Sequence, residues 1–473
     1  MSYFRAFPFH PLEEGAFFMR KSHLIKPVLG NDYPVISHGK GIYLYDKDGK
    51  QYIDGSSGAI TANIGHGVQE IAEAMWNQAK HVSFVYRSQF TSDVAETLAE
   101  KLAEIAPGDL NSVFFVNSGS EATETALKIA IQYFQEQGNF TKTKILSRWT
   151  SYHGITLGAL SMSGHQIRRQ RFNFLLEDFP VAPAPYCYQC PLKETYPGCG
   201  IRCADELENI VQAIGPEQIA AFIVEPIIGA SGGAIVPPDE YYSKIRAVCN
   251  KYDILMIADE VMTGMGRTGK MFAMEHWGVV PDIIAIGKGM SAGYTPMAAT
   301  IVSDKMMKAI ESGSKIVMSG HTFSANPQSA AVCLAVLHYM EKHNLQENAA
   351  LMGDYLLNHL QRLQWKYSLI GDVRGKGLLC GLELVKDPIT KEPFELSNKI
   401  TDRLLAICFE KGLLVYPAVG GVTGFSGDSI LISPPLTVTK EQINDIIDIL
   451  DQSICELTNQ LISEGLYITE ATS

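Results

Sequence analysis

Three ionisable residues stand at regular intervals where chemistry could converge. Glu225, Asp259 and Lys288 each follow a short apolar run, and roughly 30 residues, the length of one strand–helix–strand unit, separate one from the next. The runs are Ala221–Val224, Ile254–Ala258 and Ile283–Ile286. In an open parallel sheet, ligands bind beyond the carboxyl ends of the strands. We therefore predict that the three side chains meet in one crevice. The alternative is that each is a surface charge at the start of a loop.

A second feature could bind an anion. The turn Asn117-Ser118-Gly119-Ser120-Glu121 follows the apolar run Val113–Val116 and opens a helix pattern that ends near Phe134. Ser118 and Glu121 have the spacing of a capping box. Backbone N–H groups at such a helix start attract phosphate, and Ser118 and Ser120 can add hydroxyl donors. The alternative is a plain helix cap.

A lysine, an acidic residue and an anion site together suit one cofactor. Pyridoxal phosphate needs a lysine for its Schiff base, an acid beside its pyridine nitrogen and a cradle for its phosphate. An anionic Asp259 would keep that nitrogen protonated, so that the ring can withdraw electrons from a substrate carbanion.

The positioning elements are short buried strands that alternate with helices, with Lys144–Trp149 as a further strand. Asp239 is the expected N-cap of a helix that runs to about Tyr252. Strand, helix and strand in this order predict a parallel sheet with right-handed crossovers. Residues 35–54 predict a small antiparallel meander with a turn at Asp46–Gly49.

The predicted fold class is α/β, with a large, mostly parallel sheet domain over residues 71–325. A small α+β domain would be made from both chain ends, residues 1–70 and 326–473. The second part would start with a helix marked by Asn326 and Pro327, and end in helices and strands around Gly412–Pro417 and Ser429–Leu436.

Composition excludes several classes of protein. The 473 residues carry 39 Lys and Arg against 51 Asp and Glu, a net charge of −12, which argues against nucleic acid and anionic membrane surfaces. No apolar run approaches the roughly 18 residues of a spanning helix. The start MSYFRAFPFHPLEEG lacks a signal peptide's apolar core. With nine cysteines and no secretion signal, we expect free thiols in the cytoplasm.

Several motifs resemble those of class III, fold-type I, pyridoxal-phosphate aminotransferases, of the ω-aminotransferase kind. They cover nearly the whole chain and occur in the family's order. The matching segments are Tyr52–Gly55, Asn63–Gly67, Asn117–Ala122, Ser151–Gly154, Val224–Pro226, Leu255–Gly269, Pro281–Gly289 and His321–Phe323.

The resemblance implies roles for residues at matching positions. Lys288 would bond the cofactor and then move a proton, and Asp259 would pair with the pyridine nitrogen. The other implied cofactor contacts are Ser118, Gly119 and Ser120 at the phosphate, Val261 and Tyr152 on the two ring faces, Glu225 near the phenolic oxygen, and His153 behind the stacking tyrosine. Thr322 would reach the phosphate of a neighbouring subunit, which implies a homodimer, with a tetramer left open.

The chain departs from the family where relatives bind a substrate carboxylate. Leu431 and Tyr416 stand where different relatives carry an arginine for that carboxylate. A buried carboxylate needs a cation. We therefore expect an amine or an ω- or β-amino acid as donor. Separately, Met262 replaces a glutamine that in relatives contacts the cofactor's phenolic oxygen.

Residues outside these motifs could complete the pocket. Arg87 could supply the missing charge, or form a structural ion pair instead, and Tyr86 and Ile60 are candidate pocket residues. Arg374 lies in a stretch that the family shares, without an assigned role.

The expected reaction is a ping-pong transfer of an amino group to a 2-oxo acid such as pyruvate. An aminomutase, an epimerase or racemase, and a decarboxylase of the same fold are the alternatives.

Four cysteines suggest a further alternative. Cys187, Cys190, Cys199 and Cys203 are free thiols or a weaker zinc candidate. A metal-stapled, inactive scaffold is the alternative of another class, and an intact Lys288 and Asp259 argue against it.

Overall fold

The computed structural model describes residues 23–421 and 424–468, so the N-terminal segment considered as a signal peptide lies outside the described residues. The strands are β1 (Ile36–Lys40), β2 (Tyr43–Asp46), β3 (Gln51–Asp54), β4 (Leu110–Val116), β5 (Lys144–Arg148), β6 (Val181–Ala182), β7 (Ile219–Val224), β8 (Leu255–Asp259), β9 (Ile283–Ile286), β10 (Ala298–Ser303), β11 (Ile370–Lys376), β12 (Leu379–Leu384), β13 (Leu413–Leu414), β14 (Tyr416–Val419) and β15 (Asp428–Ile432). The helices are α1 (Ser57–Ile60), α2 (Gln69–His81), α3 (Asp93–Ile105), α4 (Gly119–Glu136), α5 (Leu157–Ser161), α6 (Gln166–Arg169), α7 (Arg202–Ile214), α8 (Tyr241–Lys251), α9 (Asp304–Ser312), α10 (Pro327–Lys342), α11 (Leu345–Lys366), α12 (Ile400–Glu410) and α13 (Lys440–Ser463).

A seven-stranded sheet forms the centre of the molecule, in the order β4-β10-β9-β8-β7-β5-β6. β5, β7, β8 and β9 pair in parallel, as the alternation of strands and helices predicts. β10 runs antiparallel between β4 and β9, and the sequence reasoning did not identify it. Its residues are all buried, and burial on both faces carries no information about strand direction. The expectation of a mostly parallel sheet is confirmed.

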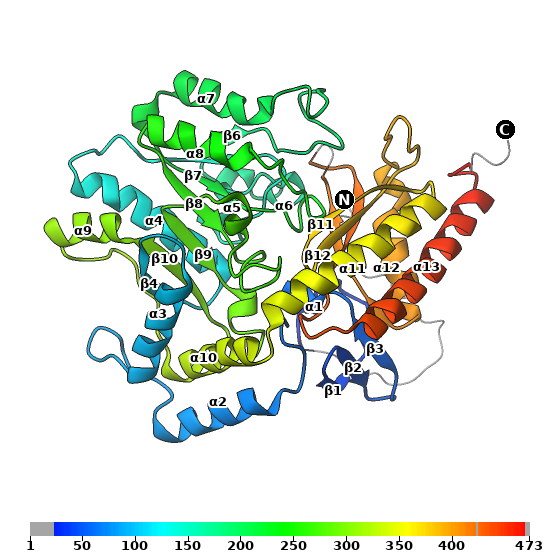
Figure 1. Cartoon of the computed structure of the whole chain (residues 1–473), viewed down its shortest axis with the longest axis horizontal. Coiled ribbons are helices and arrows are strands. Elements are labelled where there is room, and N and C mark those ends of the chain that lie inside the picture. The colour runs from blue at the N-terminus through cyan, green and yellow to red at the C-terminus, as the bar shows by residue number, and fades with distance from the viewer. Residues whose placement is uncertain (1–22, 422–423, 469–473) are drawn as a thin grey trace.

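Helices cover both faces of this sheet (Figure 1). The side chains of β7 alternate between two cores, because successive residues of a strand point to opposite faces. Phe222 and Val224 pack in the core that includes residues of α7 and α8, whereas Ala221 and Ile223 pack in the core that includes residues of α4 and α9. Such two-sided burial explains why these strands are continuous apolar runs rather than alternating ones.

Two smaller sheets lie beside the central one, both on the same side of it (Figure 1). The predicted meander is present as β1, β2 and β3, and its turn is closed by a hydrogen bond from the Gly49 N–H to the Asp46 carbonyl, 3.2 Å long. β13, from the C-terminal part of the chain, pairs in parallel with β3, so one sheet joins both chain ends. The second sheet has the order β11-β12-β15-β14. Figure 1 shows the blue N-terminal strands below the yellow-to-red C-terminal elements. The exact domain boundaries remain a prediction.

Helix starts were predicted with mixed success. The Asn326 side chain caps α10 by accepting from the Ser329 N–H at 3.0 Å, as expected. Asp239 is not an N-cap: α8 begins at Tyr241, whose N–H donates to the Pro238 carbonyl, so Asp239 lies inside that turn. None of the described helices has both the length and the apolar character needed to cross a membrane.

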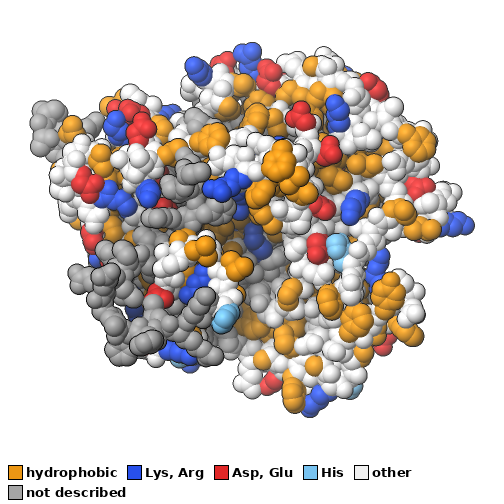
Figure 2. All heavy atoms as spheres, turned by 180° about the vertical axis from the view of Figure 1, so that it is seen from behind, with side chains coloured by type: hydrophobic (Ala, Val, Ile, Leu, Met, Phe, Trp, Pro, Cys, Tyr) orange, Lys and Arg blue, Asp and Glu red, His pale blue; other side chains and the backbone are white. Residues whose placement is uncertain are grey.

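The surface carries mixed charge. On the face drawn in Figure 2, Lys and Arg side chains are interspersed with Asp and Glu side chains and with hydrophobic ones.

Candidate active site

The structure brings Glu225, Asp259 and Lys288 together at the carboxyl edge of the central sheet. They follow β7, β8 and β9, which are neighbours in the sheet, and all three line one cavity of about 160 Å³. The other lining residues are Gly119, Ser120, Tyr152, His153, Gly154, Val261 and Met262. Adjacent parallel strands therefore place two carboxylates and an amine around one space, as the spacing in the sequence predicts.

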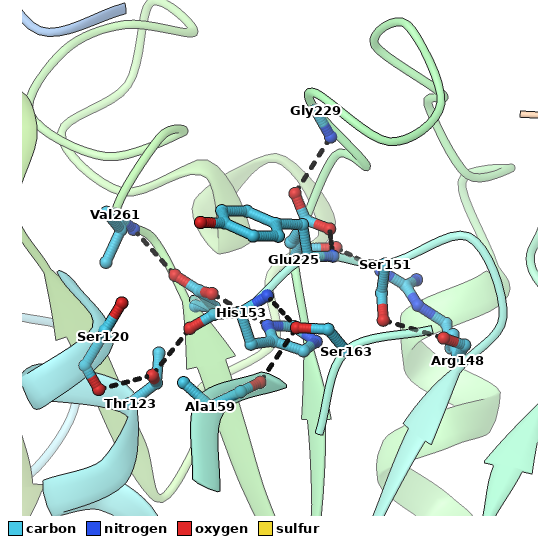
Figure 3. Close-up of polar contacts among 12 residues, drawn as sticks. Ser120, Thr123, Arg148, Ser151, His153, Ala159, Ser163, Glu225, Gly229 and Val261 are labelled. Atoms are coloured by element: carbon cyan, nitrogen blue, oxygen red, sulfur yellow. Dashed lines mark hydrogen bonds and ion pairs between the residues drawn. The ribbon is translucent and has the colours of Figure 1, made fainter. Parts of the chain in front are cut away.

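Asp259 is held on both carboxylate oxygens. His153 Nδ1 lies 2.8 Å from Asp259 Oδ2, and Asp259 Oδ1 accepts from the Val261 N–H at 3.1 Å. His153 is itself fixed through its backbone, because its backbone N–H donates to Ser163 Oγ and its backbone carbonyl accepts from Thr123 Oγ1 (Figure 3). Because a carboxylate oxygen accepts, His153 Nδ1–H is the donor in this contact, which orients Asp259 toward the cavity.

Glu225 is anchored by backbone N–H groups. Its two carboxylate oxygens accept from Tyr152 N–H at 2.8 Å and from Gly229 N–H at 3.0 Å, and Figure 3 shows the Gly229 bond. Its carbonyl accepts from the buried guanidinium of Arg148. Burial raises the pKa of the Glu225 carboxyl, while nearby His153 and the two N–H donors oppose that rise.

Lys288 combines a strained backbone with a buried amine. Its φ of 41° lies in the left-handed region, which a side chain other than glycine rarely adopts and which is typical of functional sites. Burial lowers the pKa of the Lys288 ammonium, and the negative charges of Asp259 and Glu225 partly offset this. A lysine shifted in this direction is neutral, and so nucleophilic, over a wider pH range than an exposed one.

The anion-binding turn also faces the cavity. Gly119 and Ser120 line it at the start of α4, where the first backbone N–H groups have no partner within the helix. Ser120 Oγ accepts from the Ile155 N–H at 3.0 Å, which leaves its own proton free to donate to an anion. Ser118 Oγ accepts from the Glu121 N–H at 3.2 Å and thereby caps the helix. The Glu121 carboxylate returns to the Asn117 N–H rather than to Ser118, so the predicted capping box is only half formed.

These residues fit pyridoxal phosphate. A Cβ added at Gly154 would lie 2.5 Å from Ser120 Oγ, and one added at Gly119 would lie 2.7 Å from Val261 Cγ1, so both glycines keep open the turn where a phosphate would bind. Asp259 and Lys288 offer an acid and an amine in the same cavity. The donor set therefore matches the phosphate, ring nitrogen and carbonyl of that cofactor.

Four residues named from the sequence lie elsewhere. Thr322, Tyr86 and Arg87 are exposed and do not line the cavity formed by this chain. Arg87 donates to the Ser319 carbonyl at 2.6 Å and lies over the Phe114 ring. Ile60 is buried in a core cluster with Met262, behind the cavity wall. Their roles at a substrate or at a neighbouring subunit's cofactor remain predictions.

Sequence reasoning missed several residues that hold the site. Arg148, Thr123 and Ser163 position Glu225 and His153 through the bonds described above. A charged residue at the end of a strand that is otherwise buried was the signal for Arg148. Arg374, left without a role, forms ion pairs with Asp372 and Glu383, at 2.6 and 2.7 Å.

The four clustered cysteines share a location. Cys187, Cys190, Cys199 and Cys203 line one small cavity, and all nine cysteines of the chain are free thiols. In the part of the chain that the structure describes, no group of three His, Cys, Asp or Glu residues is arranged to hold a metal ion.

Proteins similar in sequence to this chain are named as aminotransferases. The chain is 50% identical to "Uncharacterized aminotransferase YodT" of Bacillus subtilis (strain 168) over 93% of its own length and 99% of that protein. It is 35% identical to the "Putrescine--pyruvate aminotransferase" of Pseudomonas aeruginosa, over 89% of this chain and 91% of that one.

A solved transaminase structure also resembles this chain. The ω-transaminase from Pseudomonas jessenii in complex with PMP superposes with a TM-score of 0.85 at 36% identity, over 90% of this chain and 93% of that one. Residues 29–454 match the family described as "Aminotransferase class-III". The chain therefore belongs to the class III aminotransferases, the group whose cofactor chemistry its three strand-end residues predict.

Proposed function

We propose that this aminotransferase moves an amino group from an amine, or from an ω- or β-amino acid, to a 2-oxo acid such as pyruvate, using pyridoxal phosphate in a ping-pong cycle. One observation carries the proposal: Lys288, Asp259 and Glu225 share a single cavity with the start of α4. One site can serve both half-reactions in turn, because donor and acceptor need the same amine, acid and anion cradle.

Each residue has a distinct task in this proposal. The cofactor supplies an electron sink when bound. The Asp259 carboxylate, fixed by His153, would keep a proton on the pyridine nitrogen. Gly119 and Ser120 would bind the phosphate, and Val261 and Tyr152 would enclose the ring. Lys288 Nζ would hold the cofactor between turnovers and carry the proton that moves during transfer.

An apolar cluster supports an amine or ω-amino donor. Leu431 is buried in a cluster with Ile60 and Met262, and Tyr416 packs against it. Met262 lines the cavity, so this cluster borders the site. A carboxylate held against such residues would lack a cation, which makes an α-amino acid in that orientation costly. The activity named for the Pseudomonas aeruginosa relative, putrescine–pyruvate transfer, is of the proposed kind.

We also propose that the active form is a homodimer. Phe84 and Phe323 pack edge to face at 5.8 Å, and both remain exposed. Arg87 and Thr322 lie on the same two exposed segments. The exposed large hydrophobic residues of these segments are Phe84, Tyr86, Phe90, Ile316, Met318 and Phe323. A second copy that covers this apolar surface would also bring Thr322 toward a neighbouring site.

A half-reaction screen tests the proposed function. The cofactor-loaded protein is mixed with single donors without an acceptor, and loss of the visible absorption band is followed. The panel contrasts α-amino acids with ω-amino acids, β-amino acids and plain amines. Conversion mainly by the last three groups is expected. Conversion mainly by α-amino acids other than alanine, which reverses the pyruvate half-reaction, would contradict the proposed donor class, and no conversion by any donor would contradict aminotransfer itself.

A further inference from the structure

A cation beside the active-site cavity has no acidic partner. The guanidinium carbon of Arg168, in the short helix α6, lies 4.3 Å from the centroid of the Tyr152 ring, and Tyr152 lines the cavity. Across the described ranges 23–421 and 424–468, no Asp or Glu forms an ion pair with Arg168. The neighbouring Arg169 is different, since it donates to three carbonyl groups and has a structural task.

The Arg168 side chain is oriented by a short hydrogen-bonded chain. His165 Nε2 lies 2.9 Å from the Val419 carbonyl, which can only accept, so Nε2 carries the proton. His165 Nδ1 is then an acceptor, and Arg168 Nε–H donates to it at 3.2 Å. Burial lowers the pKa of His165 to about 4, which keeps this ring neutral and the donor order fixed. The guanidinium end of Arg168 consequently lies next to Tyr152 and interacts with its hydroxyl, while no carboxylate among the described residues pairs with it.

The charge of Arg168 affects the pKa values of two cavity residues. It opposes the protonated form of Lys288, lowering the pKa of that amine in the same direction as burial does. It also opposes the effect of burial on the pKa of the Tyr152 hydroxyl. A guanidinium that acts on two cavity residues without a carboxylate partner is suited to an anion that arrives with the substrate.

We propose that Arg168 is the specificity residue that binds the carboxylate group of the substrate. This inference rests on the proposed function. It resolves a difficulty in that function: a 2-oxo acid acceptor always brings a carboxylate, yet Leu431 and Tyr416, which stand where the family resemblance implies an arginine, belong to an apolar cluster. The acceptor's carboxylate and the distal carboxylate of an ω-amino acid donor share this chemistry, and both would bind on the Tyr152 side, away from the apolar cluster.

The test compares Arg168→Gln with the native holoenzyme on matched substrates. In the acceptor half-reaction, the aminated enzyme is mixed with pyruvate or with propanal, which lacks the carboxylate. In the donor half-reaction, the enzyme is mixed with 4-aminobutyrate or with butylamine. Loss of a hydrogen-bonded ion pair predicts a fall of about 10- to 100-fold in kcat/KM for the carboxylated substrate in each pair. The propanal and butylamine rates are expected to stay within about twofold.

Two further measurements keep the result interpretable. Propanoate binding to the holoenzyme, measured by calorimetry, is expected to weaken about tenfold or more in Arg168→Gln and to recover in part in Arg168→Lys. Arg171→Gln, at an exposed arginine nearby, is the matched control and should change nothing. If only one half-reaction responds, the carboxylate belongs to that substrate alone.

Equal losses with carboxylated and uncarboxylated substrates would overturn the proposal, because they would show that Arg168 merely supports Tyr152. Unchanged rates would overturn it as well. Failure of all donors with the native enzyme would instead refute the proposed function, so the two failures are distinguishable.

Discussion

The two sides of the active-site cavity are built in different ways. On the cofactor side, polar groups come from the ends of adjacent strands and from the start of α4, and nearly every one is held by a second group. Asp259, for example, is fixed by both His153 and the Val261 N–H. On the side that we propose for the substrate lie an apolar cluster around Leu431 and the oriented cation Arg168. The contrast indicates that the chemistry is set by the sheet, whereas substrate choice is set by the surrounding segments.

Of the changes on the cofactor side, removing the Lys288 amine should lower activity the most. Lys288→Ala loses both the bond to the cofactor and the proton carrier, so turnover should fall by at least about 10⁴-fold with every donor. The visible absorption band of the loaded protein should also disappear. Steady-state assays and absorption spectra check this, and full turnover in the variant would refute the assignment of Lys288.

Neutralising Asp259 should lower the rate less than removing Lys288 does, and by the same factor for all substrates. Asp259→Asn removes the negative charge that would keep the pyridine nitrogen protonated, and we expect the half-reaction rate to fall by about 100-fold or more. Amines and amino acids should lose the same factor, since this residue belongs to the cofactor side. A rate close to that of the native enzyme would show that ring protonation is not needed here.

Loss of the contact behind Asp259 should give a smaller effect. His153→Ala removes the 2.8 Å hydrogen bond that orients the carboxylate, which predicts a loss of about tenfold in kcat. His153→Asn is the matched variant, because its amide can donate from a similar position and should restore most of the rate. Similar losses in both variants would assign His153 to packing rather than to this hydrogen bond.

The smallest expected effect is a shift along the pH axis. Burial lowers the pKa of Lys288, so the cofactor-free protein should contain more neutral amine at Lys288 than at an exposed lysine at the same pH. Reaction with an amine-directed reagent, followed by mass spectrometry, should reach half its maximal rate at a lower pH for Lys288 than for the exposed Lys47. The opposite order would contradict the electrostatics described for the cavity.

The sequence predicts the cofactor side well because the ends of buried strands can be recognised in the sequence. Glu225, Asp259 and Lys288 each follow an uninterrupted buried run, and parallel pairing then brings them to one edge. The antiparallel direction of β10 could not be inferred, since its residues are all buried.

The substrate side was much harder to predict. Arg168 lies in a helix of four residues, and its significance depends on His165 and on the carbonyl of Val419, some 250 positions away in the chain. No local pattern encodes such a contact. Arg87, the cation chosen from the sequence, instead lies on the surface against Ser319.

Transfer of a labelled amino group tests the central claim most directly. The cofactor-loaded protein is mixed with ¹⁵N-putrescine, freed of unbound donor, and then given unlabelled pyruvate. The account predicts ¹⁵N-alanine in an amount comparable to that of the enzyme, and none from Lys288→Ala. Alanine without the label, or no alanine although the donor was consumed, would contradict a ping-pong transfer between an amine and a 2-oxo acid at this site.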